Sequence, residues 1–449
     1  MDHAAQVRAA RGSVPDAVPR RVKGAASRTL DRGARRRHRC DRHDRHRQVA
    51  EGDARRARDP RQGRVRRARR AAALPQEPRA LHGERLRASG RVTHDPLEPV
   101  SAVVCNYNGE QYLPGCLDAL LAQDEPPDEI LVVDNGSTDG SVRLLVERYP
   151  RVKLVALPSN AGPCVARNAG MRAARNRLVL AVDNDAVPRP DVLGRLRRAL
   201  LARPDAVAAQ PRSVFASEPT RVHYDGGRFH FTGLYSLRNF CVPLAQAEGE
   251  GVLPVDGLIA ICPLLDRDRV LALGGYDENF FILFEDYDLS LRLRIAGLAI
   301  LSVEDAIVLH RGGTPGISFR GEVYPRIRAF YHSRNRWLLL VKNHRWRTLF
   351  VSLPGLCVYE LVWTLFTLRS GHIKAHVAGK GGFLKDLGRA LDKRRHVQAS
   401  RRVADRALLV GGPLTFSPQL VRSAAARAAA GVLDALLRAW WTVARPFAG

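Results

Sequence analysis

The residues of this chain best placed to do chemistry are two aspartates that close a short apolar run. Leu178–Val182 is apolar throughout, and Asp183-Asn184-Asp185 follow it directly before the pattern breaks at Pro188. An apolar run that ends in a turn signal is typical of a buried parallel strand. Ligands bind at the carboxyl ends of such strands, and two carboxylates there suit a hard cation such as Mg²⁺ or Mn²⁺ that holds a phosphate. A polar turn after a strand is the alternative interpretation.

Three further polar clusters stand at the ends of predicted strands or at the start of a helix: Asn106–Asn108, Asp134–Ser137 and Glu285-Asp286. Each alone is weak evidence, since a Glu-Asp pair at a helix start is often only a favourable partner of the helix dipole. Glu285-Asp286 lie between an apolar run and a helical pattern that extends to Ala296, which favours a catalytic role over a helix cap.

The elements that must position these clusters alternate between strands and helices. The apolar patterns predict strands at Val100–Asn106, Glu129–Val133, Val152–Leu157 and Leu178–Val182. They predict helices at Gln111–Gln123, Gly140–Tyr149 and Pro163–Arg175. Such an alternation with short loops predicts an α/β fold with a doubly wound, mostly parallel sheet.

Beyond Asp185 the pattern is less regular. It predicts strands at Ala206–Phe215, Arg228–Leu237 and Val255–Leu265, with a pair of strands over Ala299–Val308 that leads to His310. It predicts helices at Pro190–Leu201 and Asp268–Leu273.

The net charge of the 449 residues is +27 and is unevenly spread. Residues 1–95 contain 27 Lys and Arg against 11 Asp and Glu, with almost no periodic apolar pattern. Such a segment cannot bury enough apolar area to fold alone, so we predict a basic, disordered extension. A basic arm for nucleic acid or anionic lipid is the alternative, although no aromatic residues interleave the basic ones.

Residues 321–449 are predicted to form a helical, basic region that associates with a membrane. Leu349–Leu368 is apolar over about twenty residues, long enough in principle to span a bilayer. Pro354 and Glu360 lie within it and basic residues flank it, which favours a helix that lies on or dips into the membrane. A buried helical pair joined at Pro354-Gly355 is the alternative.

The seven cysteines form no Cys-x-x-Cys pair, and most lie in apolar runs, which is typical of free thiols in a reducing compartment. The N-terminus shows no apolar segment of a secretory signal. We therefore expect a cytoplasmic protein, peripheral at the inner face of the plasma membrane, with a single span at 349–368 as the alternative.

The order and spacing of the clusters resemble those of inverting family-2 glycosyltransferases with the GT-A fold, in particular rhamnosyltransferase-like and galactofuranosyltransferase-like members. The matching segments are VSAVVCNYNGEQYLPGCLDALLAQ at Val100–Gln123, EILVVDNGSTDGS at Glu129–Ser141, NAGPCVARNAGMRAA at Asn160–Ala174, LVLAVDNDAVP at Leu178–Pro188 and GGYDENFFILFEDYDLSLRLRIAG at Gly274–Gly297. The resemblance covers residues 98–345 and does not reach 1–95. Cys105-Asn106 replace the frequent Pro-Thr or Pro-Ser of the family, which should be tolerated because the backbone does much of the binding there.

The resemblance implies a role for each matching side chain. The donor nucleotide would be bound by Tyr107, Asn108, Asp134, Arg167, Asn168 and Asp183. The metal ligands would be Asp185, Asp183 and His310. Asp286 would be the general base that deprotonates the acceptor hydroxyl, and Glu285 would bind the acceptor.

The predicted function is therefore metal-dependent, inverting transfer of a sugar from a nucleoside diphosphate sugar to a glycan or polyprenyl-linked acceptor, in cell-envelope polysaccharide synthesis. The cofactor would be Mg²⁺ or Mn²⁺, an anionic membrane surface would be a partner, and no specific nucleic acid is expected. Residues 98–320 would form the GT-A domain, with a nucleotide-sugar half at 98–187 and an acceptor half at 188–320. A nucleotidyltransferase is the enzymatic alternative, but it would need a Gly-rich basic loop where Asn106–Gly109 stand. The non-enzymatic alternative is a nucleic-acid-binding protein that uses the basic arm.

Overall fold

The computed structural model describes residues 98–311 and 324–449. Both ranges belong to one compact unit, Gly90–Gly449. The predicted basic extension at 1–95 lies outside the described residues, and so does the predicted domain boundary at residue 320.

The first part of the described chain alternates between strands and helices as predicted. Its elements are β1 (Val100–Asn106), α1 (Leu113–Leu121), β2 (Glu129–Asp134), α2 (Ser141–Arg148), β3 (Lys153–Ala156), α3 (Pro163–Ala173) and β4 (Leu178–Asp183). The strands β4, β1, β2 and β3 lie side by side in this order and are all parallel. The mostly parallel α/β sheet is therefore confirmed, and its carboxyl edge gathers the polar ends of these strands.

Side-chain alternation along β1 divides the core into two layers. Val103 packs with Met171 of α3 on one face, whereas Val104 packs with Leu117 of α1 on the other. Successive residues of a strand point to opposite faces, so a continuous apolar strand serves both layers at once. This explains why the central strands are apolar throughout rather than alternating.

Most strands of the second part extend the same sheet, in antiparallel and parallel pairs, whereas the hairpin at residues 227–237 belongs to a separate three-stranded sheet. Its elements are β5 (Ala186–Pro188), α4 (Val192–Leu201), β6 (Ala206–Phe215), β7 (Glu218–Tyr224), β8 (Gly227–His230), β9 (Leu234–Leu237), β10 (Val252–Val255), β11 (Leu264–Asp266), α5 (Arg267–Ala272), α6 (Glu285–Ile295) and β12 (Ala299–His310). The ten-stranded sheet runs β10-β12-β6-β11-β4-β1-β2-β3, with β5 on β12 and β7 on β6.

Three predicted strands of this part differ from the structure. Val255–Leu265 is not one strand, because β10 ends at Val255 and β11 begins at Leu264. Side chains, rather than a regular ladder of backbone hydrogen bonds to a neighbouring strand, hold the loop between them. Gln210 donates to the Gly257 carbonyl at 3.0 Å, and the Leu258 N–H donates to Ser290 at 3.0 Å. Arg228–Leu237 is a hairpin of β8 and β9, and Ala299–Val308 is one strand that continues to His310.

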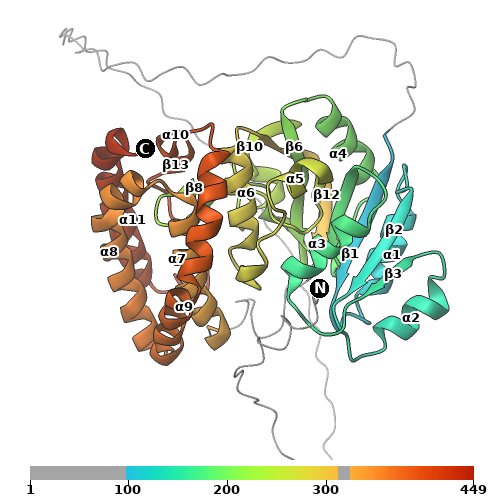
Figure 1. The fold of residues 1–449 in the computed structure, drawn as a ribbon, viewed down its shortest axis with the longest axis horizontal. Coiled ribbons are helices and arrows are strands. Elements are labelled where there is room, and N and C mark those ends of the chain that lie inside the picture. The colour runs from blue at the N-terminus through green and yellow to red at the C-terminus, as the bar shows by residue number, and fades with distance from the viewer. Residues whose placement is uncertain (1–97, 312–323) are drawn as a thin grey trace, which may run out of the picture. The chain divides into compact units, whose positions relative to one another are not determined.

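The C-terminal part packs beside the sheet domain as a group of helices (Figure 1). Its elements are α7 (Arg326–Asn343), α8 (Trp346–Arg369), α9 (Ile373–Ala399), α10 (Asp405–Leu408), β13 (Leu409–Val410) and α11 (Ala424–Ala444). Among the contacts that join it to the sheet domain, β13 pairs in parallel with β8, and the Phe231 and Trp441 rings stack with centroids 4.8 Å apart.

Helix α8 is continuous through Pro354, so the alternative of a helical pair joined at Pro354-Gly355 is wrong. By length and composition α8 is long and apolar enough to cross a membrane. Neighbouring helices fix its direction: Trp363 donates to Ser333 of α7 at 2.9 Å, and Trp440 of α11 donates to the Val351 carbonyl at 3.0 Å.

A pair of glycine substitutions tests the contact between α3 and the sheet. A Cβ on Gly170 of α3 would lie 2.2 Å from Cγ1 of Val103, whereas a Cβ on Gly388 of α9 would meet nothing within 4 Å. We expect Gly170→Ala to lower the free energy of unfolding by about 1–3 kcal/mol, because the helix must move off the sheet. Gly388→Ala should raise it by up to about 1 kcal/mol, because alanine favours a helix interior. Urea unfolding of both variants measures the difference, and equal effects would contradict the close contact.

Candidate active site

The parallel register aligns the polar ends of three strands at one edge of the sheet. Cys105 pairs with Asp183, and Asn106 pairs with Asp134. The Asn106 amide joins the two sides: it donates to Asp134 at 3.0 Å and accepts from Asn184 at 2.7 Å. The edge is therefore a connected polar surface built on rigid strands.

The loops after β1 and β2 bind each other through side chains predicted to bind the nucleotide. Asp134 is buried and accepts from the Ser137 N–H at 2.9 Å. Asn108 accepts from the Thr138 N–H at 2.7 Å, and its own N–H donates to Ser137 at 2.8 Å. Tyr107 is 45% exposed and lines the cavity described below, whereas Asp134 does not. In this structure Asp134 and Asn108 hold the loops, and Tyr107 is available to a ligand.

Arg167 lies among the acidic side chains and bridges two elements. Its guanidinium is 2.9 Å from Asp183 of β4, 3.4 Å from Glu285 and 3.9 Å from Asp286, both of α6. The ring of Tyr276 lies beneath it, 5.3 Å from the guanidinium carbon. Burial disfavours the charge, but Asp183 and the other neighbouring acids hold the pKa of Arg167 well above its usual range. Arg167 is therefore a permanent buried cation that lets three carboxylates lie close together.

Asn168, the neighbour of Arg167, faces another part of the molecule. Its amide donates to the Tyr276 carbonyl at 2.8 Å and to Glu278 at 2.9 Å, and it accepts from the Tyr276 N–H at 2.8 Å. Asn168 is 1% exposed and does not line the cavity. It positions the 276–278 loop here, and nothing in the geometry directs it to a nucleotide.

Asp183, Asp185 and His310 form a group that fits a divalent cation. Their ligand atoms all lie within 4.8 Å of one another, and His310 Nε2 is 3.3 Å from Asp185 Oδ1. His310 reaches this place because β12 pairs with β5 just after the two aspartates. Its Nδ1 is buried and has no hydrogen-bond partner among the described residues, and the ring stacks on His223 with centroids 5.0 Å apart. Carboxylate oxygens with one imidazole are a donor set typical of Mn²⁺ and also accepted by Mg²⁺.

Asp286 is placed to take a proton near neutral pH. Its Oδ2 accepts from the Ala260 N–H at 3.2 Å, while Oδ1 has no hydrogen-bond partner among the described residues. Burial, reinforced by the Glu285 charge, raises the pKa of Asp286 to about 7, although Arg167 acts in the opposite direction. Burial also raises the pKa of Glu285, again against the effect of Arg167. A carboxyl poised near 7 suits general base catalysis.

The loop before Asp286 has an unusual backbone that sequence patterns did not indicate. Phe281, Leu283 and Phe284 have φ angles of 58°, 67° and 72°, a region that side chains with a Cβ rarely adopt. Asn335 of α7 compensates, since its amide nitrogen lies 2.9 Å from the carbonyl oxygens of residues 280, 282 and 283. On the other side Gly162, at φ 89°, leaves room for Phe281, because a Cβ there would be 2.7 Å from its ring.

Asn335 is thus a site residue that the sequence analysis missed. The available signal was a polar triplet, Arg334–Arg336, within a helical pattern whose next residues, Trp337–Val341, are apolar.

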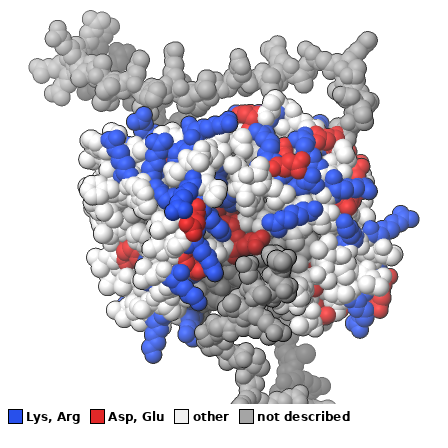
Figure 2. All heavy atoms as spheres, viewed as in Figure 1, with Lys and Arg blue, Asp and Glu red and all other residues white. Residues whose placement is uncertain are grey.

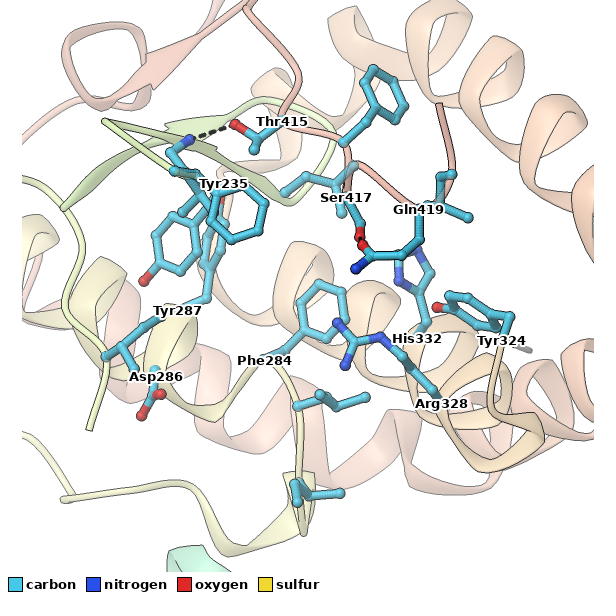
Figure 3. A pocket seen from close by; sticks show the side chains of 18 of the residues that line it. Tyr235, Phe284, Asp286, Tyr287, Tyr324, Arg328, His332, Thr415, Ser417 and Gln419 are labelled. Carbon is cyan, nitrogen blue, oxygen red and sulfur yellow. Dashed lines mark hydrogen bonds between the residues drawn. The ribbon is translucent and has the colours of Figure 1, made fainter. Parts of the chain in front are cut away.

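Arg167, His310 and the carboxylates around them line one cavity of about 1790 Å³. It extends from the strand ends to the C-terminal helices, and Figure 3 shows Asp286 and Tyr287 on one wall with Arg328, His332 and Tyr324 opposite. The carboxylates among its described lining residues all lie at the strand-end side, and they are Asp183, Asp185, Glu285 and Asp286.

Comparison with known proteins gives the class of this chain, a glycosyltransferase. The model of Glycosyl transferase family 2 matches residues 101–245, and that of Glycosyl transferase family group 2 matches residues 178–379. An N-acetylglucosaminyl-diphospho-decaprenol L-rhamnosyltransferase of Mycobacterium tuberculosis is 32% identical over 245 residues, which cover 47% of this chain and 75% of that protein. The chain belongs to glycosyltransferase family 2, and the nucleotidyltransferase alternative is set aside.

Other similarities cover less or are more distant. The succinoglycan biosynthesis protein ExoO of Rhizobium meliloti is 41% identical over 117 residues, 26% of this chain and 32% of that protein, so this chain spans about a third of that relative. Among solved structures, TarS of S. aureus aligns with a TM-score of 0.41 and 15% identity over 77% of this chain and 91% of that one. The mannosyltransferase PcManGT of Pyrobaculum calidifontis, solved with GDP-Man and Mn²⁺, aligns with a TM-score of 0.38 and 18% identity over 79% and 85%.

Substitution of Asn335 tests whether the loop geometry matters for turnover. Asn335→Ala removes the donor that holds residues 280–283, so we expect Asp286 to shift and turnover to fall about 10²-fold. Mn²⁺ affinity should not change, because the metal-ligand group comes from other elements. Asn343→Ala is the matched control: it is a buried asparagine on the same helix that donates to Asp288 and not to the loop. Equal losses of turnover in both variants would assign Asn335 to general stability.

Proposed function

We propose that this protein is a metal-dependent, inverting glycosyltransferase that moves a sugar from a nucleoside diphosphate sugar to a glycan or lipid-linked acceptor in cell-envelope polysaccharide synthesis. The observation that carries the proposal is that one cavity holds a candidate metal group and a carboxyl with a raised pKa, joined through Arg167. The relative named for transfer of L-rhamnose to a lipid-linked sugar is consistent with such an acceptor.

The candidate metal group would act on the leaving diphosphate. Asp183, Asp185 and His310 would hold the cation, which neutralises the negative charge that develops on the diphosphate as it departs. Burial raises the pKa of Asp183, and the Arg167 guanidinium 2.9 Å away acts in the opposite direction. Arg167 therefore favours the ionised form of a carboxylate that would bind the metal.

Asp286 would act on the acceptor. It removes the proton of the acceptor hydroxyl as that oxygen bonds to the anomeric carbon, and the bond from this carbon to the diphosphate oxygen breaks on the opposite face. One displacement inverts the configuration, and its only proton goes to Asp286. Burial and the Glu285 charge keep the pKa of Asp286 high, and Glu285 would also bind the acceptor.

We also propose that the protein works at the cytoplasmic face of the plasma membrane as a peripheral protein, with one span through α8 as the alternative. Residues 324–449 contain 22 Lys and Arg against 5 Asp and Glu, whereas residues 98–311 contain 22 against 28. Figure 2 shows Lys and Arg side chains spread over the C-terminal helices. A surface this basic is attracted to anionic lipid headgroups.

Cation-dependent donor binding tests the metal assignment. We expect one nucleotide sugar from a panel to stabilise the protein against heat only when Mn²⁺ or Mg²⁺ is present, because the cation bridges protein and diphosphate. Asp185→Asn should abolish this effect. Asp191→Asn, at a surface aspartate paired with Arg195, should retain it. Donor stabilisation that persists in EDTA would overturn the metal role.

The Asp286→Asn variant tests the base. Donor and cation binding should remain, while turnover falls by about 10²–10⁴-fold because the proton acceptor is lost. In the wild type kcat/KM should rise with pH to a plateau above about 7, where Asp286 is ionised. Wild-type turnover in the variant would exclude Asp286 as the base.

The thermal stability of the Asp286→Asn variant tests the raised pKa of Asp286. The pKa of Asp286 in the folded protein, about 7, is above its ordinary value of 3.8, so the folded state binds the proton more tightly than the unfolded state. The stabilisation that Asp286 gives the folded state is complete at low pH, where the carboxyl is protonated, and is lost as pH rises through about 7. Asp286→Asn should therefore melt at a higher temperature than wild type at pH 8, and this advantage should shrink at pH 5. An advantage independent of pH would contradict the raised pKa.

A further inference from the structure

The cavity is larger than one small ligand requires. Sites for single small molecules are usually about 300–1,000 Å³, and this cavity measures about 1790 Å³. Its strand-end side accounts for the donor and the reacting groups. The remaining part, which we call the apolar arm, lies between α7, α8 and α11. Its lining includes Ile327, Val362, Leu365, Phe366, Ala429 and Leu433, together with polar side chains of the 414–423 segment such as Ser417 and Gln419.

The arm differs from the strand-end side in charge. None of its described lining residues is acidic, and Arg328 and Arg369 supply its positive charge. Figure 3 shows Arg328 on the wall opposite Asp286. A ligand that fills the arm is therefore apolar along most of its length and carries negative charge toward the reacting end.

The arm opens onto an exposed apolar face of α8. Leu361, Val362, Leu365 and Leu368 are 62%, 40%, 55% and 60% exposed, at the spacing of one helical stripe. Val362 and Leu365 belong to this stripe and also line the arm, whereas Leu361 and Leu368 do not line it. An apolar chain can pass from the cavity to the outside of α8 without leaving apolar surface.

We propose that the apolar arm binds the hydrocarbon chain of a lipid-linked acceptor and that this chain leaves the cavity across Val362 and Leu365. The inference rests on the proposed function, because it takes the acceptor hydroxyl to lie at Asp286. Arg328, on the wall opposite Asp286, then faces the phosphate groups that link chain and sugar. The long axis of the acceptor follows the cavity from α8 to the strand ends, so its sugar lies at the strand ends and its hydrocarbon chain at α8.

Binding of farnesyl diphosphate tests the arm without any glycosyl transfer. We expect the full chain, titrated calorimetrically in EDTA, to bind farnesyl diphosphate at least about tenfold more tightly than inorganic diphosphate, because the chain buries apolar area in the arm. EDTA prevents binding through the metal group. Leu365→Glu and Ala429→Trp should each weaken binding at least about tenfold. Both positions are exposed, so folding should be retained.

Leu361→Glu is the matched control, since Leu361 lies on the same exposed stripe but outside the cavity. It should bind farnesyl diphosphate as the wild type does. Equal weakening by Leu361→Glu and Leu365→Glu, or no preference for farnesyl over inorganic diphosphate, would overturn the proposal. Wild-type dimers that Leu365→Glu dissociates, without farnesyl diphosphate binding, would instead make the arm an interface between copies.

The two proposals can fail separately. Donor-dependent stabilisation by Mn²⁺ needs Asp185 and not the arm, so its failure would reject the transferase mechanism alone. Failure of the wild type to bind farnesyl diphosphate, with its cation-dependent donor binding intact, would reject the arm alone.

Discussion

The arrangement of this site depends on one buried cation, Arg167. It is 7% exposed and lies within 4 Å of Asp183, Glu285 and Asp286. Without it, three carboxylates would repel one another in a poorly solvated pocket and at least one would bind a proton. Buried ion pairs add little net stability, because desolvation offsets the attraction. What Arg167 contributes is position: one side chain of α3 joins the end of β4 to the start of α6, and so relates the candidate metal group to the candidate general base.

The C-terminal helices place a second constraint on one of these carboxyls, that of Asp286. The left-handed backbone at Phe281, Leu283 and Phe284 is unfavourable by itself and persists only where its surroundings determine it. Asn335 fixes this backbone, because its side-chain amide donates hydrogen bonds to carbonyl oxygens of the loop. The helical region is therefore part of the site, and α7 could not be removed without freeing the loop that presents Asp286. Strain at this point places a buried carboxyl at a helix N-terminus, where the helix dipole favours its ionised form.

The strands and the acidic groups were predictable where local pattern and topology agree. β1 and β6 have the predicted bounds, and parallel pairing alone brings the ends of β1, β2 and β4 to one edge. Asp183, Asp185 and His310 meet as the resemblance implied, although they are far apart in sequence. The loop at 256–263 was mistaken for a strand, because its polar backbone groups are satisfied by distant side chains such as Gln210. Asn335 was missed for the same reason, since its partners lie more than fifty residues away.

The overall charge of +27 is the sum of unlike parts. The sheet domain has more acids than bases, so the proposed anionic donor would be bound through a few placed groups rather than through a positive field. The helical region carries a large excess of Lys and Arg, and α8 within it turns apolar side chains outward while Ser352 and Thr367 face inward. A helix of a protein that meets only water buries its apolar face instead. Basic charge beside an outward apolar stripe matches the two layers of a bilayer, headgroups and hydrocarbon, so the region that holds Asp286 in place also suits the surface from which a lipid-borne acceptor would arrive.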